Sequence, residues 1–427
     1  MFALDPLFGR FIKLGHLVLT DHQGRVHHYG DETAPADSAV RLRTPEAAWK
    51  IARNPAYNIG AVYTDGDLTI EKGTLLGFVG LLLRNLMEFN RRPAMRAINR
   101  LEEFTSMPAF MNWASRSRRN VAHHYDLSAA LFALFLDSDR QYSCAYYRDE
   151  HADLEEAQLA KKQHIAAKLL IHPGQHILDI GSGWGGLALY LAQHYPNVRV
   201  TGLTLSEEQF HAATERARQS GLADRVTFKL ADYRRETTTY DRVVSVGMFE
   251  HVGRPQFGTF FNKIKQLLKP DGVALIHTIG FQTPPAAINP WLRHNIFPGA
   301  YLPALSQLAP QIERRGFWLA DLETLRLHYA YTLAAWHKRF QANREKVAHL
   351  YDERFCRMWE YYLQCCEAGF RWSGLTVFQL QVANTVDAVP ITRDYITQEE
   401  ARLRALDAET APLIHHRAGP RKLDAHA

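Results

Sequence analysis

The chain has 427 residues, of which 46% are hydrophobic and 22% are charged. This ordinary globular composition excludes a wholly disordered, collagen-like or coiled-coil protein, and the length predicts about two or three domains. Lysine and arginine outnumber aspartate and glutamate by 50 to 45, which gives a formal net charge of +5. Such a mildly basic balance is compatible with a phosphate-rich partner without identifying one.

Apolar segments in this chain are too short for a spanning helix. The longest, Leu75 to Leu83, falls well short of the roughly 18–20 residues that a bilayer requires. Charged residues interrupt the first twenty positions, so we expect no export signal. The 4 cysteines include no CxxC pair, so we expect neither a disulfide framework nor a metal site. These features favour a protein of the reducing cytoplasm.

Residues 1–110 predict a small mixed α+β domain. Leu17–Thr20 and Val26–Tyr29 have strand-like composition on either side of a polar turn, which predicts a hairpin. A helical pattern follows at Pro45–Ala52, and another at Leu75–Arg100 mixes apolar residues with arginines. A basic apolar helix of this kind could lie on anionic lipid headgroups, and a solvated helix packed on its neighbour is the alternative.

Strands and helices alternate in the next part of the chain. The predicted strands are Ile177–Ile180, Val198–Leu203, Val226–Leu230, Arg242–Val246 and Val273–Thr278, with predicted helices at 186–194, 207–220 and 256–268. This alternation predicts an α/β fold with a parallel, doubly wound sheet. After about Ala330 the pattern predicts long helices, and from Asp407 we expect a mobile polar tail. The predicted domains are an N-terminal domain at 1–110, a linker at 111–122, a catalytic domain with helical insertions at 123–400 and a tail at 401–427.

A glycine turn between a predicted strand and a predicted helix is the strongest local signal. It reads Leu178-Asp179-Ile180-Gly181-Ser182-Gly183-Trp184-Gly185-Gly186. Glycine lets the backbone turn tightly and approach a ligand, and the helix N-terminus offers free N–H groups. The turn also satisfies the GxGxxG pattern of dinucleotide sites, but the next strand ends without the acidic residue that NAD ribose requires.

An acidic residue just before the glycines resembles the S-adenosyl-L-methionine site of class I methyltransferases, which implies a Rossmann-like fold. In such a site Asp179 could interact with the amine of the donor. Thr204 and Gln209 could hold the ribose hydroxyls, and Asp232 with Tyr233 could recognise and stack the adenine. The expected donor site therefore includes Gly181 and Gly183 as well as these side chains.

The segment after the fourth predicted strand narrows the range of possible substrates. It reads Gly247-Met248-Phe249-Glu250-His251 and lacks the Asn-Pro-Pro-Tyr or Asp-Pro-Pro-Tyr sequence that amino-methylating nucleic-acid enzymes usually carry. We therefore expect no nucleic-acid partner.

Several separated segments resemble the cyclopropane-fatty-acid synthase and mycolic-acid cyclopropane synthase family. They occur in family order over roughly residues 118–390, and they are His124-Tyr125-Asp126-Leu127-Ser128, Gln141–Tyr146, Leu178–Gly185, Gly202–Ser206, Val246–His251, His277–Gly280 and Ile296–Gly299. The N-terminal part also resembles the additional domain of the bacterial phospholipid-modifying members.

This resemblance implies transfer of a methylene unit from S-adenosyl-L-methionine to the cis double bond of an unsaturated acyl chain in a membrane phospholipid. A carbocation would form, and a bound bicarbonate would remove a proton so that a cyclopropane ring closes. The enzyme would be cytoplasmic, bound peripherally to the bilayer surface at the inner face of the membrane, and the sequence allows a homodimer. The resemblance assigns the methionine end of the donor to Tyr142 and Ser143, and the bicarbonate site to Cys144, Glu250, His277, Tyr329 and the backbone of Ile279.

Each of these residues also has a plainer explanation. Cys144 alone would be a small buried hydrophobe, Glu250 could cap a turn, and His277 could be a hydrogen-bonded structural histidine. Tyr329 has a histidine beside it and a second tyrosine two residues on, so only the resemblance selects it. Two rival functions stay open: methylation of an acyl chain or amine without ring closure, and lipid binding by an inert cofactor fold. Aromatic residues that could line an acyl channel or form ordinary core are Trp291, Phe297, Tyr301, Trp336, Trp359 and Phe378.

Overall fold

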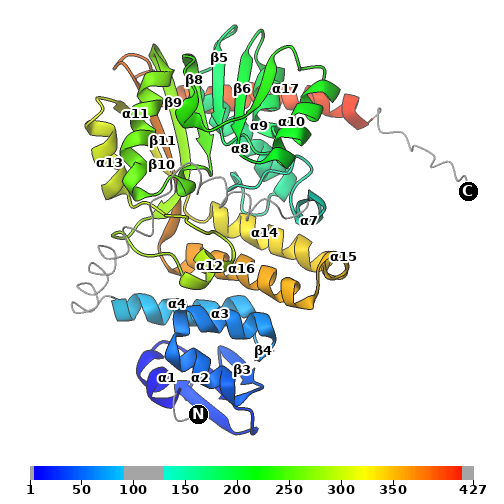
Figure 1. The fold of residues 1–427 in the computed structure, drawn as a ribbon, viewed down its shortest axis with the longest axis vertical. Coiled ribbons are helices and arrows are strands. Elements are labelled where there is room, and N and C mark those ends of the chain that lie inside the picture. The colour runs from blue at the N-terminus through cyan, green and yellow to red at the C-terminus, as the bar shows by residue number, and fades with distance from the viewer. Residues whose placement is uncertain (1–3, 91–128, 416–427) are drawn as a thin grey trace, which may run out of the picture.

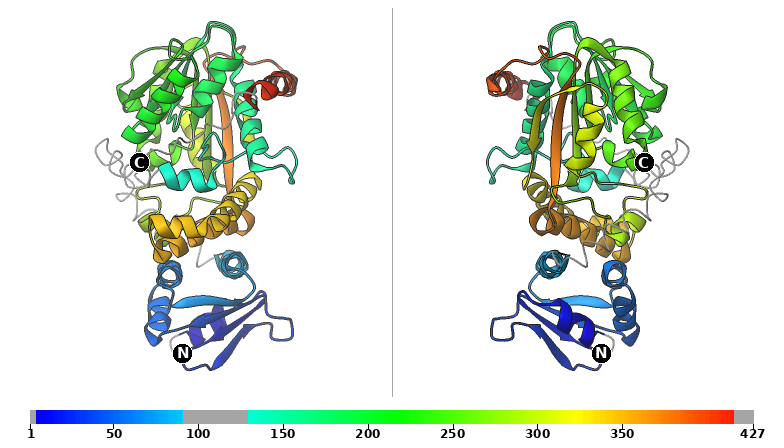
Figure 2. Two further views of the ribbon diagram at one scale, coloured as in Figure 1. Left: turned by 90° about the vertical axis from the view of Figure 1, so that its right-hand side faces the viewer. Right: turned by 90° about the vertical axis from the view of Figure 1, so that its left-hand side faces the viewer.

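The computed structural model describes residues 4–90 and 129–415, which form an N-terminal α+β unit, a layer of helices and a large α/β unit in this order along the long axis (Figures 1 and 2). The predicted linker at 111–122, the second half of the basic segment at 91–100 and the 124–128 motif lie outside these residues. No helix within the described ranges is long and apolar enough to cross a membrane.

The N-terminal unit contains a mixed sheet with the order β2-β1-β3-β4. The predicted hairpin is confirmed, because β1 and β2 pair antiparallel, while β3 is parallel to β1 and β4 is antiparallel to β3. The strands of this unit are β1 (His16–Thr20), β2 (Val26–Gly30), β3 (Ser38–Leu42) and β4 (Leu68–Lys72), and the helices are α1 (Asp5–Phe11), α2 (Pro45–Arg53), α3 (Pro55–Asp65) and α4 (Leu75–Asn90).

The large unit has a seven-stranded sheet with the order β10-β11-β9-β8-β5-β6-β7. Neighbouring strands from β9 to β7 are all parallel, which confirms the predicted α/β fold. The antiparallel strands β11 and β10 extend the sheet beyond β9. The strands are β5 (His176–Ile180), β6 (Arg199–Thr204), β7 (Val226–Leu230), β8 (Tyr240–Val246), β9 (Leu268–Phe281), β10 (Trp318–Thr324) and β11 (Leu375–Ala383).

Helices cover both faces of this sheet, so it is doubly wound as predicted. Two separate apolar cores result, one under α8, α9, α10 and α17 and the other under α11 and α13. The helices and 3₁₀ turns of this unit are α8 (Leu154–Leu169), α9 (Gly186–His194), α10 (Glu207–Gln219), η2 (Tyr233–Arg235), η3 (Phe249–His251), η4 (Arg254–Gln256), α11 (Phe257–Leu267), α13 (Leu305–Glu313) and α17 (Asp394–His415).

Two features of the C-terminal region differ from the prediction. Strands β10 and β11 were missed; β11 is almost wholly buried, yet Gln379 and Gln381 interrupt the apolar run that identifies a buried strand. The tail expected from Asp407 is wrong for residues 407–415, because α17 continues to His415, and the rest of the predicted tail lies outside the described residues. Asp407 accepts hydrogen bonds from the Tyr190 hydroxyl, at 2.9 Å, and from Gln163.

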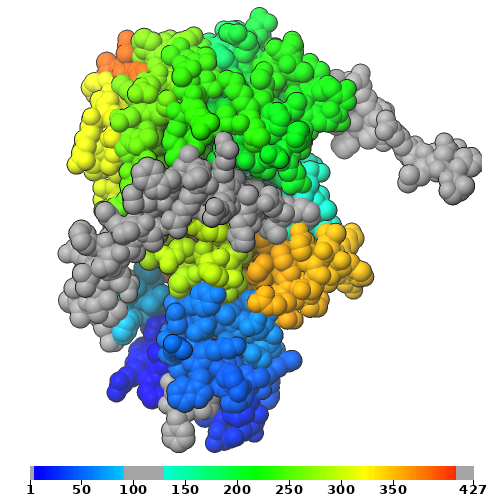
Figure 3. All heavy atoms as spheres, viewed as in Figure 1, coloured from blue at the N-terminus to red at the C-terminus, as the bar shows by residue number. Residues whose placement is uncertain are grey.

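A layer of helices connects the two units. It consists of α7 (Ala129–Phe135), α12 (Pro290–Asn295), α14 (His328–Ala342), α15 (Arg344–Leu350) and α16 (Glu353–Trp372). Helix α16 packs on α3 and α4 on the N-terminal side and on α14 and β11 on the other. A Cβ atom on Gly60 of α3 would lie 2.6 Å from the Tyr361 ring, so glycine is needed for this close approach. The space-filling view shows the N-terminal unit directly against this layer (Figure 3).

Candidate functional site

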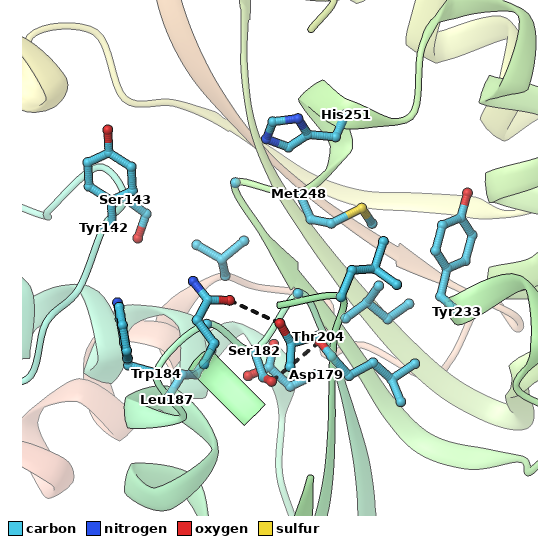
Figure 4. Close-up of a pocket in the computed structure, with 18 of the residues that line it drawn as sticks. Tyr142, Ser143, Asp179, Ser182, Trp184, Leu187, Thr204, Tyr233, Met248 and His251 are labelled. Atoms are coloured by element: carbon cyan, nitrogen blue, oxygen red, sulfur yellow. Dashed lines mark hydrogen bonds between the residues drawn. The ribbon is translucent and has the colours of Figure 1, made fainter. Parts of the chain in front are cut away.

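A pocket lies where the parallel strands of the large sheet end. Its wall comes from the segment before α8, the glycine turn after β5, and the segments that follow β6, β7 and β8 (Figure 4). Ligands of open α/β sheets bind in this position, outside the carboxyl ends of the strands. All residues predicted to bind the donor are in the wall: Tyr142, Ser143, Asp179, Gly181, Gly183, Thr204, Gln209, Asp232 and Tyr233.

The glycine turn has the backbone conformation that requires glycine. Gly181 and Gly183 have φ angles of +85° and +52°, in the left-handed region that other residues rarely adopt. A Cβ atom on Gly183 would meet no protein atom within 4 Å, whereas one on Gly181 would lie 2.8 Å from Met248. The turn is fixed to β6, because the N–H groups of Gly181 and Ser182 both donate to the Leu203 carbonyl at 2.9 Å.

Asp179 is the acidic residue at the base of the pocket. Its side chain is almost completely buried, and burial raises the pKa of its carboxyl to about 7. The nearby ammonium group of Lys161 opposes this rise. A ligand amine bound here would favour the ionised carboxylate.

Lys161 of α8 is a wall residue that the sequence analysis missed. It is 1% exposed, and its Nζ donates to Ser143 Oγ at 2.8 Å and to Gln141 Oε1 at 2.6 Å. Burial lowers the pKa of this lysine to about 8. The available signal was its spacing: Lys161 lies four residues after Ala157 and four before Ile165, and both of these apolar residues are buried. A buried cation at this position can bind a ligand carboxylate.

The ribose candidates lie next to each other after β6. Thr204 Oγ1 donates to Gln209 Oε1 at 2.9 Å, and accepts from the Ser206 N–H at 3.2 Å (Figure 4). Ser206 is the N-cap of α10, and its hydroxyl accepts from the Gln209 N–H, which fixes the start of the helix. These contacts hold two polar side chains at the edge of the pocket.

The adenine candidates follow β7. Asp232 forms an ion pair with Arg234 at 2.5 Å and begins the 3₁₀ turn that carries Tyr233. The ring of Tyr233 packs edge-on against Phe260, with centroids 5.5 Å apart. Both side chains are therefore positioned by their own neighbours.

The five residues expected to bind bicarbonate are not in the pocket wall. Glu250 is 5% exposed, and its Oε1 accepts from the Ile279 N–H at 2.6 Å. Its Oε2 is buried and has no hydrogen-bond partner within residues 4–90 and 129–415. Burial raises the pKa of Glu250 to about 7, so near neutral pH a fraction of its carboxyl groups carries a proton.

Tyr329 interacts electrostatically with Cys144 and Glu250. Burial raises the pKa of Tyr329 well above its ordinary value, and its interactions with Tyr142, Cys144 and Glu250 raise it further. The Cys144 thiol is buried, which raises its pKa, and it donates to the Ala145 carbonyl at 3.3 Å. A buried thiol of this kind does not act as a nucleophile.

His277 of β9 is joined to the pocket wall through its backbone. It lies two residues before Ile279, and the Gly247 N–H of the pocket wall donates to its carbonyl at 2.9 Å. Burial and the nearby Lys161 lower the pKa of His277 to about 3, so the imidazole is neutral. Its Nδ1 atom lies 3.2 Å from Gln379 Nε2.

Aromatic side chains form a cluster between the pocket and α16. Tyr142 of the wall stacks on Trp336 with centroids 5.2 Å apart, and its hydroxyl lies 2.7 Å from that of Tyr362. Tyr329 packs edge-on against the same Trp336. Some of the aromatic residues that could line an acyl channel lie in or against the apolar core that contains this cluster: Trp291, Phe297, Trp336 and Trp359. The other two, Tyr301 and Phe378, belong to the core under α11.

Comparison with known proteins identifies the family of this chain. Residues 113–380 match the family described as mycolic acid cyclopropane synthetase. The cyclopropane-fatty-acyl-phospholipid synthase of Escherichia coli strain K12 is 37% identical over 364 residues, which cover 83% of this chain and 90% of that protein. The tuberculostearic acid methyltransferase UfaA1 of Mycobacterium tuberculosis is 35% identical over 375 residues, covering 82% and 86% of the two chains.

A solved structure shares the fold of the large unit. The mycolic acid cyclopropane synthase CmaA1, crystallised with S-adenosylhomocysteine and CTAB, has a TM-score of 0.59 and 33% identity, covering 62% of this chain and 98% of that one. The resemblance to this family and the expected class I methyltransferase fold are both confirmed. The chain is an S-adenosylmethionine-dependent methyltransferase that belongs to the mycolic acid cyclopropane synthetase family.

Proposed function

We propose that this enzyme transfers a methylene unit from S-adenosylmethionine to the cis double bond of an unsaturated acyl chain in a membrane phospholipid, forming a cyclopropane ring. The observation that carries the proposal is the carboxyl group of Glu250. One oxygen is fixed by the Ile279 N–H, and the other is buried without a partner in the described part of the chain. Because burial raises the pKa of Glu250 to about 7, this group can hold a proton and donate it in a hydrogen bond to a small anion.

The residues of the pocket fit the donor. Asp179 matches its amine, Lys161 and Ser143 match its carboxylate, and the opening at Gly183 admits a ligand close to the backbone. Thr204 and Gln209 match the ribose hydroxyls, with Asp232 and Tyr233 at the adenine. This arrangement would hold the sulfonium carbon at the end of the pocket near Tyr142.

In the proposed reaction the π electrons of the alkene form the new C–C bond as the S–CH₃ bond breaks. S-adenosylhomocysteine leaves, and positive charge remains on the acyl chain. When bound, bicarbonate supplies the base for the proton of the new methyl group, whose C–H electrons then close the ring. Glu250, Tyr329 and the neutral His277 would orient this anion. The rings of Tyr142 and Trp336 would exclude water and stabilise the transient cation.

The N-terminal unit is proposed to bind the bilayer. Trp49 of α2 is 68% exposed, beside Lys50 and Arg53 on the same helix. Tryptophan favours the membrane interface, and lysine and arginine attract anionic headgroups. The acyl chain itself is held by burial, which contributes about 0.8 kcal/mol per CH₂ group. We therefore propose a peripheral enzyme at the cytoplasmic face of the membrane.

The decisive experiment is a vesicle assay with isotopically labelled donor and an unsaturated phospholipid. We expect products that gain one CH₂ unit and can no longer be hydrogenated at the former double bond. Products that gain a methyl branch instead would support methylation without ring closure, the second candidate, which the similarity to the tuberculostearic acid methyltransferase favours. Donor turnover without any lipid product would overturn both.

A further inference from the structure

A row of polar side chains crosses the large sheet beneath α8. In the strand register Glu323 of β10 lies opposite Gln379 of β11, which lies opposite His277 of β9. Directly opposed residues in antiparallel strands share a face. Gln379 and His277 are 0% and 2% exposed, so the row leads from the sheet edge to the buried end of the site.

The side-chain amide of Gln379 forms fewer hydrogen bonds than it could. Its Oε1 atom is buried without a hydrogen-bond partner among the residues that the structure describes, and its Nε2 atom lies 3.2 Å from His277 Nδ1. A buried amide with an unused acceptor destabilises a fold. Gln381, two residues on and equally buried, has both groups engaged: its Nε2 donates to the Lys168 carbonyl, and its Oε1 accepts from the Tyr395 hydroxyl at 3.0 Å.

The surroundings of His277 keep its ring neutral. Burial is the largest cause of its pKa of about 3, and Lys161, Lys168 and His164 lower it further, while Glu323 opposes them. A neutral imidazole carries one N–H, and the partner of one nitrogen decides which nitrogen has it. Because the amide Nε2 of Gln379 is a donor, Nδ1 of His277 must accept and its proton must be on Nε2.

We propose that Gln379 is a positioning residue that keeps the proton of His277 on Nε2, so that this N–H is available to donate to the small anion of the reaction. The part of this proposal that concerns the anion rests on the proposed function. The relationship between Gln379 and His277 does not depend on it. It explains why an amide with an unused acceptor occupies the middle of β11. Replacement of Gln379 would release the ring to take either tautomer and either orientation.

The test compares Gln379→Met with Gln381→Met in the full-length protein. Nitrogen NMR of protein labelled at histidine reports the tautomer of His277 directly, without any ligand. We expect the Nε2–H form in the wild type and in Gln381→Met, and a mixture in Gln379→Met. Gln379→Glu provides a second, nearly isosteric variant, in which the carboxylate should draw the proton to Nδ1. A wild-type ring protonated on Nδ1, or one that Gln379→Met leaves unchanged, would overturn the proposal.

Kinetics in bicarbonate-depleted buffer complete the test. We expect Gln379→Met to raise the bicarbonate concentration for half-maximal turnover by about 10-fold, the usual size of an effect from a residue that orients a ligand-binding histidine. The apparent KM for the donor should not change, and Gln381→Met should behave as the wild type. If turnover of the wild type does not depend on bicarbonate, the anion in the proposed function is wrong, while the NMR result still decides the role of Gln379.

Discussion

Glu250 and Ile279 are joined by a hydrogen bond of 2.6 Å from the Ile279 N–H to Glu250 Oε1, which leaves Oε2 of the same carboxyl buried and unpaired among the described residues. The bond ties the 3₁₀ turn after β8 to strand β9. It therefore orients the free oxygen from a rigid element rather than from a loop, as a preorganised binding group requires.

Glu250→Gln should lower turnover by about 100-fold, because an amide cannot ionise and therefore cannot take up or release a proton as the carboxyl can. Donor affinity, measured by isothermal titration, should be unchanged, since Glu250 is not in the pocket wall. The control is Glu313→Gln, at an exposed position of α13. Wild-type turnover in Glu250→Gln would remove this residue from the site.

Lys161→Met should weaken donor binding by about 10-fold or more, because a buried hydrogen bond to a charged group contributes about 1.5–3 kcal/mol. In the wild type the affinity should also fall as the pH rises above about 8, since burial lowers the pKa of Lys161 to that value and only the ammonium form attracts a carboxylate. Titration calorimetry across pH measures both effects.

Lys162→Met is the matched control for this experiment. Lys162 is the next residue, and its ammonium group pairs with Asp139 at 2.8 Å outside the pocket wall. The donor affinity of Lys162→Met should depend on pH in the same way as that of the wild type. A pH-independent affinity in the wild type, or equal losses in both variants, would contradict a direct role for Lys161.

Asp179→Asn should stabilise the ligand-free protein increasingly as the pH rises from 5 to 8. The folded-state pKa of Asp179 is about 7, above its unfolded value of 3.8, so over most of this range the unfolded chain binds fewer protons and wild-type stability falls with pH. Two pH units of this effect amount to about 3 kcal/mol. Urea unfolding at several pH values measures the difference.

The effect of Asp232→Asn on the free energy of unfolding should not change between pH 5 and 8. Although burial alone would raise the pKa of Asp232, hydrogen bonds from Arg234 hold it below the usual value, so the carboxyl is ionised in both states from pH 5 to 8. Its effect on unfolding should therefore be a constant offset. Parallel slopes for the two variants would mean that Asp179 does not hold a proton in the folded protein.

Trp49→Ser should reduce partition onto anionic vesicles by about 10-fold or more, because burial of a large apolar side chain contributes about 1.5–3 kcal/mol. Trp318→Ser is the matched control: this tryptophan is 55% exposed, but on edge strand β10 of the catalytic sheet. Co-sedimentation with vesicles distinguishes the two. Equal losses would argue against membrane binding through the N-terminal unit.

Local sequence determined much of this structure. The glycine turn, the hairpin and the parallel strands have short-range signals, and the predicted donor residues line one pocket because strand ends must meet at one edge of the sheet. The roles of Lys161 and Gln379 were missed because local sequence carries no signal for them. A buried lysine on a helix and a glutamine inside a buried strand contradict local patterns, and only their distant partners, Ser143 and His277, explain them.

Helix α16 packs against both units, so the two units share an interface and are not connected by a hinge alone. Tyr361 of this helix fills the space left by Gly60 of the N-terminal unit, and Tyr362, the next residue, reaches Tyr142 at the donor pocket. Removal of the N-terminal unit would leave an apolar helix face in water, so a truncated enzyme should self-associate. A displacement of the N-terminal helices would likewise move Tyr362 against Tyr142, a residue of the pocket wall.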